Sequence, residues 1–434
     1  IGMLDPKFVA ENIKEVKRII KVRGKGVDVA ELNKLAKARS KTRVRVEKLR
    51  AEQNKLSKGA KNKKPPADDI KRASEIKREL KNLDPQLKNI EKQLNTLLRQ
   101  LPNLIHPDVP PGKDETENKV MRKWGKPTKF SFKPKDHLEL GENLGVIDVE
   151  TASEVAGSGF GYLKGDAALL EFALVQYAFS VLSDEKILKV IADKVSKGYN
   201  SKPFTPVVPP VMIRPDVMDK MARLEPKEER YHILGDDLYL VGSAEHTLGP
   251  MHMDEIIPEE ELPIRYVGFS TSFRREAGSY GRDTRGILRV HQFDKIEIES
   301  FTTPENSVVE QDFIVGIQEY LMQSLKIPYQ VVAICAGELG APDYRQIDIE
   351  VWLPGQGRYR ETHTSDLMTD YQARRLNTRF KGDSGTEFVH MNDATVFAIG
   401  RTIIAILENY QQKDGSVKVP APLVPYVGKK IIRR

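Results

Sequence analysis

Two runs of apolar residues at heptad spacing constrain the fold of the first quarter of this chain. In the later run, apolar residues alternate steps of three and four from Ala73 to Leu101 without a break. The earlier run has a seven-residue repeat, in which the same heptad position is occupied by Leu35, Thr42, Leu49 and Leu56. This period is that of a coiled-coil seam, so two long helices are predicted.

The stretch between the two runs predicts an antiparallel hairpin. It reads SKGAKNKKPPADD and contains Gly59, Pro65 and Pro66, which are typical of a turn. Each helix of roughly 27 residues would be about 40 Å long. Pro85 within the second helix should bend it or remove one hydrogen bond. A short amphipathic helix from Leu4 to Val22 is predicted before the hairpin.

The hairpin carries a strong positive charge. Between Leu32 and Gln100 there are 21 Lys and Arg residues against 8 Asp and Glu residues, an excess of +13. Because the whole chain carries +7, the remainder carries −6. A basic segment on a mildly acidic body favours a polyanionic partner such as nucleic acid. A protein partner, which is the commoner use of heptads, stays open from this segment alone.

A second hairpin is predicted in the middle of the chain, with strands from Tyr266 to Arg274 and from Ile287 to Phe301. The second strand alternates, with Leu288, Val290, Ile296 and Ile298 on one face. Its other face carries Arg289, His291, Phe293, Lys295, Glu297 and Glu299. A face with this much charge is costly to bury unless it binds a charged ligand. A solvated hairpin is the alternative.

The spacing of the polar face indicates the ligand. Phe293 and Glu297 lie about 13 Å apart on one face, which suits a molecule with a flat ring at one end and an amine at the other. Arg274 can form two parallel hydrogen bonds to a phosphate, and Glu276 can accept a hydrogen bond from an exocyclic amine. The loop 277–286, with Arg282, Asp283 and Arg285, is long and polar enough to reach a second, anionic substrate.

Two oxygen-bearing residues further along suit a metal ion. Glu361 and Thr364 offer a carboxylate and a hydroxyl three residues apart, and such hard oxygen ligands suit Mg²⁺ on a triphosphate. Helices are expected from Ala167 to Leu182, buried on nearly every side, and from about Ser307 to Leu325. The final stretch, VPYVGKKIIRR, is basic and is expected to be solvated.

Several features bear on the cellular compartment. Cys335 is the single cysteine, so we expect neither a disulfide nor a cysteine-based zinc site. No apolar run approaches the roughly 18–20 residues of a membrane span. The opening IGMLDPKF lacks the basic and apolar regions of a signal peptide. A cytoplasmic protein that does not contact a membrane is expected.

Three motifs resemble those of the class II aminoacyl-tRNA synthetases. The run FRREAGSYGRDTRG, followed by HQFDK, resembles motif 2 in its seryl-tRNA synthetase form, of the bacterial type. The run ATVFAIGRTIIAILENYQQ resembles motif 3, with Arg401 near its strand–helix junction. The proline-rich KPFTPVVPPVMIR is similar to motif 1, which in that family packs across a dimer interface; its prolines favour extended backbone near a sheet edge.

The resemblance implies an α+β fold, with an antiparallel β-sheet class II synthetase core flanked by helices and an N-terminal antiparallel α-helical coiled-coil hairpin. Residues 1–104 would form the tRNA-binding arm and residues 105–434 the catalytic domain of a homodimer. The implied activity is ATP-dependent activation of L-serine and its transfer to tRNA(Ser), with a selenocysteine tRNA, tRNA(Sec), as a second candidate acceptor. ATP and Mg²⁺ would be required.

The resemblance also implies the site residues. Arg274 and Arg401 would be catalytic, and Glu361 and Thr364 would hold the metal. ATP contacts would come from Arg274, Arg275, Glu276, Val290, Phe293, Glu361, Thr362, His363, Thr364 and Arg401. Serine contacts would come from Ser243, Ala244, Glu245, Arg274, Glu297 and Thr395.

The chain departs from the family pattern at several of these positions. His363 and Leu367 replace residues of the usual Glu-(Ile/Val)-Ser-Ser-x-Ser-Asn run, and Asp393 stands where Asn is usual, adding a negative charge near the substrate amine. These departures motivate one alternative, a non-catalytic synthetase paralogue. The other alternative is a synthetase-like amino-acid ligase that loads a carrier protein, although that family lacks the long arm.

Overall fold

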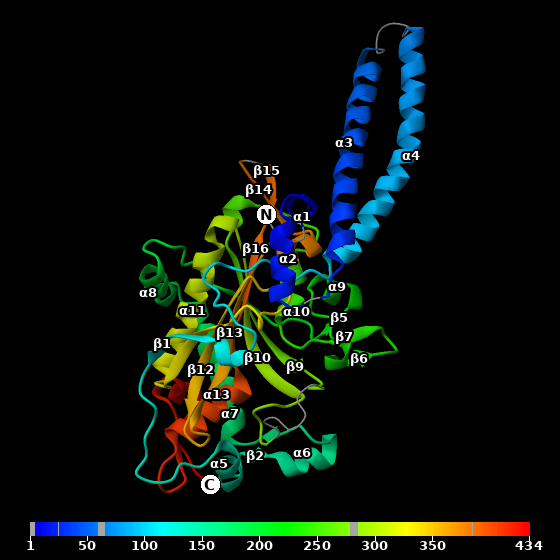
Figure 1. Ribbon diagram of the computed structural model, residues 1–434. Coiled ribbons are helices and arrows are strands. Elements are labelled where there is room, and N and C mark those ends of the chain that lie inside the picture. The colour runs from blue at the N-terminus through cyan, green and yellow to red at the C-terminus, as the bar shows by residue number, and fades with distance from the viewer. Residues whose placement is uncertain (1–4, 25, 60–65, 278–284, 384) are drawn as a thin grey trace. The chain divides into compact units, whose positions relative to one another are not determined.

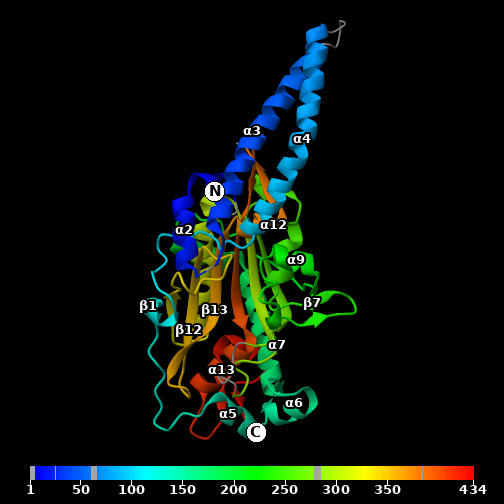
Figure 2. The same ribbon diagram turned by 45° about the vertical axis from the view of Figure 1, so that its right-hand side comes forward.

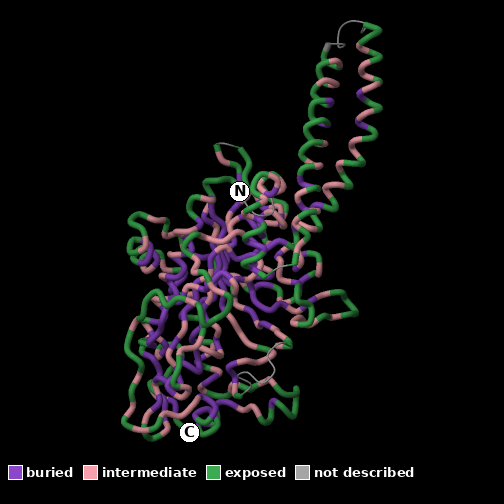
Figure 3. The backbone as a smooth tube through the Cα atoms, in the orientation of Figure 1, coloured by how far each residue is buried: buried purple, intermediate pink, exposed green. Residues whose placement is uncertain are grey.

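The computed structural model describes residues 5–24, 26–59, 66–277, 285–383 and 385–434. The chain divides into two compact units, Ile1–Leu104 and Ile105–Arg434. Figure 3 shows that buried backbone is concentrated in the second unit, whereas the long helices of the first are mostly exposed or intermediate. Each unit is described by itself below.

The described residues of the first unit form four helices: α1 (Pro6–Glu11), α2 (Ile13–Val22), α3 (Val29–Gly59) and α4 (Ala67–Leu98). The single helix expected from Leu4 to Val22 is therefore wrong in detail, because it is broken at Asn12. Asn12 adopts φ −121° and ψ 36°, outside the helical region. Its backbone N–H and its side-chain amide both donate to the carbonyl of Phe8, which ends α1.

The long helices α3 and α4 lie side by side as an antiparallel hairpin (Figures 1 and 2). Their seam buries Val46, Leu49, Ile76 and Leu80, with Leu56, Leu83 and Leu87 packed against them. The predicted helical hairpin is confirmed, and α4 continues through Pro85. The turn residues 60–65, including Pro65, lie outside the described residues.

Ion pairs between arginines and acidic residues join the two long helices. Within the described part of the hairpin these pairs are Arg39–Glu91, Arg45–Glu79, Arg50–Asp84 and Arg72–Glu52. None of them uses a lysine, although lysines supply much of the positive charge. The arginines therefore stabilise the hairpin, and exposed lysines are left on its surface.

The second unit is built on an eight-stranded sheet, in the order β1-β11-β12-β13-β16-β10-β9-β4. All neighbours are antiparallel except β4, which runs parallel to β9 at the edge. The predicted α+β class with an antiparallel sheet is confirmed. The strands are β1 (Lys119–Trp124), β4 (Thr205–Val207), β9 (Ile264–Phe273), β10 (Gln292–Thr302), β11 (Tyr329–Ala333), β12 (Arg345–Leu353), β13 (Arg358–Thr369) and β16 (His390–Ala398).

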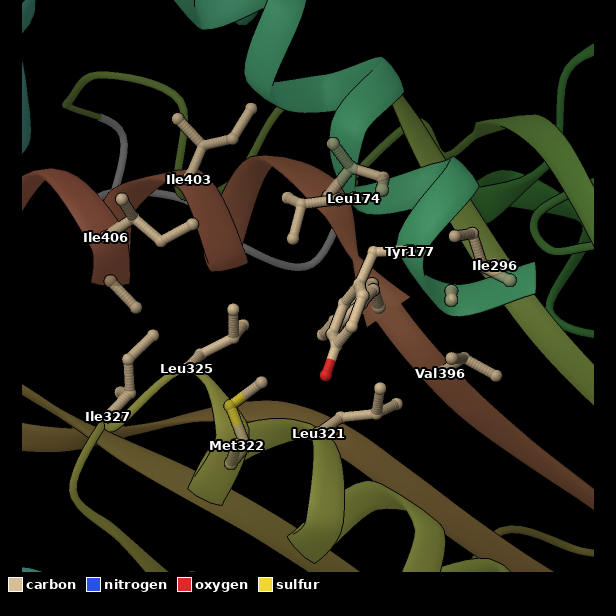
Figure 4. Close-up of a cluster of buried hydrophobic side chains, with 14 of the residues drawn as sticks. Leu174, Tyr177, Ile296, Leu321, Met322, Leu325, Ile327, Val396, Ile403 and Ile406 are labelled. Atoms are coloured by element: carbon tan, nitrogen blue, oxygen red, sulfur yellow. The ribbon is translucent and has the colours of Figure 1, made fainter. Parts of the chain in front are cut away.

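Three helices cover one face of this sheet: α7 (Asp166–Leu182), α11 (Ser307–Ser324) and α13 (Ile399–Tyr410) (Figure 1). Figure 4 shows part of the core, in which Leu174 of α7, Leu321 of α11 and Ile403 of α13 lie in one cluster with Ile296 and Val396 of the sheet. This packing fixes which side of β10 faces the core. Residues that alternate with Ile296 must point to the opposite face of the sheet.

Helix α7 is buried on one side only, which corrects the expectation that it is buried on nearly every side. Its buried residues follow the helical period, as Leu170, Leu174, Ala178 and Val181 do. Phe172 is 58% exposed and Leu169 is 44% exposed. Hydrophobicity alone could not distinguish the core side of α7 from this exposed apolar side.

The predicted central hairpin is present as β9 and β10, but its second strand begins at Gln292 and not at Ile287. The backbone N–H of Ile287 donates to His137 Nε2, at 3.2 Å, and that of His291 donates to the carbonyl of Gly159. Because these donors bond outside the sheet, the intervening residues do not continue the strand.

The remaining helices and strands described in the second unit have at most 11 residues each. They are α5 (His137–Leu144), β2 (Ile147–Asp148), α6 (Val149–Ala156), β3 (Tyr162–Leu163), α8 (Glu185–Val195), β5 (Met212–Ile213), α9 (Pro215–Lys220), β6 (His232–Ile233), β7 (Leu238–Leu240), α10 (Glu245–Leu248), β8 (Ile256–Pro258), α12 (Tyr371–Leu376), β14 (Arg379–Gly382), β15 (Gly385–Phe388), β17 (Val417–Lys418), α14 (Val424–Val427) and β18 (Ile431–Ile432).

The C-terminal segment is not solvated throughout, contrary to expectation. Strand β18 pairs with β17, and Val427 and Ile432 are buried in the main core. Among the described residues, no single helix has the length and apolar character to cross a membrane; the pair α7 and α8, bent by 69° at its break, passes that test by length and composition.

Candidate active site

A cleft opens on the face of β10 opposite to the core. It is lined by residues of β10, β13 and β16, of the segments 274–276 and 287–290, of the loop after α9 and of the first turns of α10 and α13. The lining residues are Arg223, Glu245, Arg274, Glu276, Ile287, Leu288, Arg289, Val290, Phe293, Lys295, Glu297, Glu361, Thr362, Thr364, Asp366, Asp393, Thr395, Ala398, Gly400 and Arg401.

One end of the cleft offers a flat, partly apolar surface beside a cation. The Arg274 guanidinium carbon lies 5.3 Å from the centre of the Phe293 ring. Arg274 Nε donates to the carbonyl of Gly242 at 3.1 Å, which fixes the side chain. Val290 lines the same end. A planar base can stack on the Phe293 ring here, with Arg274 close to any phosphate attached to it.

Ion pairs hold the charged side of this end. Arg401 Nη1 lies 3.2 Å from Glu361 Oε1, and Arg289 Nη1 lies 2.7 Å from Glu276 Oε2. Glu276 was expected to accept a hydrogen bond from an exocyclic amine, but in this structure it forms an ion pair with Arg289. A second cavity of about 770 Å³ adjoins the cleft and shares Arg289, Glu361 and Arg401 with it. There is room beside these cations for an extended anion such as a triphosphate.

The donors at Glu361 and Thr364 fit a hard divalent cation. Thr364 Oγ1 lies 3.4 Å from Glu361 Oε1, and the Glu361 side chain is 48% exposed to the cleft. Burial alone would raise the pKa of Glu361, but Arg401, Lys295 and Arg274 outweigh it and lower that pKa. The carboxylate is thus ionised. Among the described residues no three acidic, His or Cys side chains form a complete metal site, so phosphate oxygens would have to supply further ligands.

The other end of the cleft is acidic. Glu297 forms an ion pair with Lys295, and Thr395 Oγ1 donates to Glu297 Oε1 at 3.1 Å. Lys295 Nζ also donates to Ser243 Oγ at 3.3 Å. Glu245 lines the same end. Two carboxylates and a hydroxyl are suited to bind an ammonium group and a neighbouring hydroxyl.

The two carboxyl groups differ in acidity. Burial raises the pKa of Glu297 to about 7, against the opposing effect of Lys295 and with added repulsion from Glu245. Burial would also raise the pKa of Glu245, but the Arg223 guanidinium outweighs it and lowers that pKa. Glu245 is therefore the permanently charged member, and Glu297 is the one that titrates near neutral pH.

Most of the expected site residues line this cleft, but four do not. His363 is fully buried, its Nδ1 lies 2.8 Å from Thr362 Oγ1, and its ring lies against Phe397. His363 lies on the core side of β13 and does not line the cleft, so the expected contact between His363 and ATP is wrong. Arg275 is exposed outside the cleft, while Ser243 and Ala244 are buried behind it.

Four charged residues also lie in the cleft without having been assigned a role. They are Arg223, Arg289, Lys295 and Asp366. The polar alternation predicted over residues 287–301 pointed to Arg289 and Lys295, but nothing in the sequence pointed to Arg223, which lies in the loop after α9. Of the expected loop 277–286, Arg282 and Asp283 lie outside the described residues, and Arg285 is an exposed residue 3.6 Å from Asp136.

Family models match both units of the chain. The seryl-tRNA synthetase N-terminal domain matches residues 3–105, and the class II core domain of the tRNA synthetases for G, H, P, S and T matches residues 229–410. The second match spans β9, β10, β13 and β16, which build the cleft.

Full-length relatives agree with these matches. The serine–tRNA ligase of Rubrobacter xylanophilus is 40% identical, and that of Thermodesulfovibrio yellowstonii is 41% identical; the matches cover 99% of this chain and 99% and 100% of the relatives. The crystal structure of the seryl-tRNA synthetase from Pyrococcus horikoshii complexed with ATP matches with a TM-score of 0.84, 36% identity and 99% coverage of each chain. The chain belongs to the seryl-tRNA synthetase family.

Proposed function

We propose that this protein is a serine–tRNA ligase, which activates L-serine with ATP and transfers the seryl group to tRNA(Ser). One observation carries the proposal: two positions of β10, four residues apart, present different chemistry to a single cleft. Phe293 and Arg274 suit an adenine nucleotide, whereas Glu297 and Thr395 suit an ammonium group and a hydroxyl. The relatives named serine–tRNA ligase support the same conclusion.

In the first step, a carboxylate oxygen of serine attacks the α-phosphorus of ATP. The bond from that phosphorus to the bridging oxygen of pyrophosphate breaks, giving seryl-adenylate and pyrophosphate. Arg274 steadies the α-phosphate and the incoming carboxylate, which otherwise repel each other. Arg401 and Arg289 hold charge on the departing pyrophosphate. No side chain has to move a proton, so positioning and electrostatics carry this step.

The amino-acid end selects serine by its polar groups. Glu297 and Glu245 bind the ammonium group, and Thr395 tests for the side-chain hydroxyl. A site that hydrogen-bonds a hydroxyl rejects alanine strongly, because its own buried polar groups would be left unpaired. In the second step a terminal ribose hydroxyl of the tRNA attacks the activated carbonyl and AMP leaves. Whether tRNA(Sec) is a further acceptor is tested by charging both transcripts.

Glu361 and Thr364 would hold Mg²⁺ on the phosphates. Bound there, the ion supplies charge neutralisation for the triphosphate. We expect Thr364→Val, which keeps the shape and removes the oxygen, to raise the Mg²⁺ concentration needed for half-maximal activation by about tenfold. His363→Ser is the matched control on the core side of the strand and should leave this Mg²⁺ requirement unchanged. Equal requirements in both variants and the unmodified protein would contradict the assignment of Thr364.

The pKa of Glu297 predicts a pH dependence. This carboxyl faces Lys295, Glu245 and Glu299, and its pKa is raised to about 7, so it loses its charge as pH falls through that value. Binding of the serine ammonium needs the charged form. We therefore expect kcat/KM for serine to fall below about pH 7, by up to about tenfold per pH unit, while KM for ATP stays constant. A flat serine profile between pH 7 and 6 would contradict this account.

The arm of the first unit would hold tRNA by charge. Lys34, Lys41, Lys48 and Lys55 recur every seven residues on α3 and are exposed. Among the described residues Lys41, Lys48 and Lys55 have no ion partner, and Lys34 pairs only with Glu31 on its own helix. A seven-residue spacing places them along one stripe of the helix. This stripe supports a polyanionic partner over a protein partner.

The quaternary state and the compartment complete the proposal. The motif-1-like segment forms β4 at the sheet edge, and Val208, directly after it, is 83% exposed. An exposed apolar residue beside the edge strand supports the expected homodimer. We expect the dimer to work in the cytoplasm. The whole proposal is tested by charging a tRNA(Ser) transcript with labelled serine.

A further inference from the structure

Three acidic residues form a row across the sheet, next to the row that contains Glu297 and Thr395. Glu299 of β10 lies opposite Asp393 of β16, and Asp393 lies opposite Asp366 of β13. Residues two apart on a strand share a face, so this acidic row faces the cleft side about 7 Å from the Glu297 row. All three side chains are buried.

The acidic row lies beyond the substrate amine as seen from the nucleotide. Along β10 the order is Phe293, Glu297 and then Glu299. Since the amino acid directs its carboxylate towards ATP, its far end points to the acidic row. A side chain longer than that of serine would extend in this direction.

Among the residues that the structure describes, Arg223 is the arginine that forms an ion pair with this row. The Arg223 side chain is 16% exposed, and its Nη2 donates to Asp393 Oδ2 at 3.0 Å. Its Nε lies 3.0 Å from Glu245 Oε1. Asp393, which was expected to add charge near the substrate amine, is instead held by Arg223. Among the described residues, neither carboxyl oxygen of Glu299 nor Oδ1 of Asp366 has a hydrogen-bond partner.

We infer that Arg223 is an internal counter-cation that sets the amino-acid specificity of this enzyme. Its guanidinium occupies the acidic layer behind the serine row and repels any cationic side chain that would reach there. Without it, Glu245, Asp393 and Asp366 would offer a second site for positive charge, and a diamino acid would satisfy it. This inference rests on the proposed function, because it assumes that serine binds at Glu297 and Thr395.

The test compares serine with 2,4-diaminobutyrate in amino-acid-dependent exchange of pyrophosphate into ATP. Arg223→Gln should raise KM for serine by about tenfold or more, with KM for ATP within about twofold of the unmodified protein. The ratio of kcat/KM for diaminobutyrate to that for serine should rise by about 30-fold. Arg223→Lys, which keeps the charge, should leave this ratio within about threefold of the original.

The double variant Arg223→Gln with Asp393→Asn removes the guanidinium together with the carboxyl group that it contacts. The ratio of kcat/KM for diaminobutyrate to that for serine should lie between the values of Arg223→Gln and the unmodified protein. If Arg223→Gln does not fold, the double variant is compared with the unmodified protein in its place. Equal ratios in all these proteins, or an equal rise of both KM values, overturn the inference and leave serine activation standing. An unmodified protein that exchanges no pyrophosphate with serine overturns the proposed function and this inference with it.

Discussion

Glu297→Ala is expected to lower kcat/KM for serine by about 1000-fold, because it removes one partner of a buried charge contact. The serine ammonium would then bind in a largely buried site where Glu245 is the remaining carboxylate. Lys295 would also lose its ion pair with residue 297. KM for ATP should change by less than about threefold, since the nucleotide end is four residues away on the strand. Glu297→Gln is the matched variant, which keeps the shape and removes only the charge, and it should show most of the same loss.

Phe293→Ala provides the opposite control on the same strand. It should raise KM for ATP by about tenfold to 100-fold through the loss of base stacking, with little change in KM for serine. Phe293→Tyr, which keeps an aromatic face, should be close to the unmodified protein. If Glu297→Ala and Phe293→Ala affect the same substrate, the assignment of the two ends of the cleft is wrong.

Removal of the arm from Val29 to Leu101 is expected to abolish tRNA charging, by about 1000-fold or more, and to spare serine activation. The excess of +13 between Leu32 and Gln100 would be lost with it. The second unit has its own core and contains every residue of the cleft, so pyrophosphate exchange should persist. A truncated protein that charges tRNA at the full rate would contradict a role for the arm.

A sharper version of this experiment leaves the fold of the arm intact. Replacing Lys41, Lys48 and Lys55 together by Gln should weaken tRNA binding and reduce the slope of log K against log salt by about one for each phosphate that no longer meets a lysine. The paired arginines supply the matched control: Arg45→Lys keeps the charge opposite Glu79 and should leave the slope unchanged. A salt slope that is the same in both variants would favour a protein partner for the arm.

The helical arm and the central hairpin were predictable because each is defined by local periodicity. The heptads of α3 and α4 and the alternation of β10 need no knowledge of distant contacts. The break at Asn12 was missed because it depends on a single capping residue within an otherwise periodic helix. The exposed side of α7 was missed because an apolar sequence does not show which side has a partner.

The part of the site that sequence reasoning could not assemble depends on long-range pairing. Arg223 comes from a loop and meets Asp393, 170 positions later, because β16 places Asp393 at the cleft. His363 could not be excluded from the cleft beforehand, since the register shift between Ile349 and Glu350 changes which residues of β13 face it. Family resemblance located the strands, but only the sheet register assigned side chains to the two faces.

The central claim is that this cleft joins serine to ATP, and pyrophosphate exchange tests it most directly. With Mg²⁺, the unmodified protein should incorporate labelled pyrophosphate into ATP when serine is added, and alanine or glycine should be worse substrates by about 10⁴-fold. The departures at Leu367, His363 and Asp393 do not alter this expectation, because Leu367 and His363 are buried and Asp393 is paired with Arg223. No exchange with serine, or comparable exchange with alanine or glycine, would contradict the account and favour the paralogue or the carrier-protein ligase.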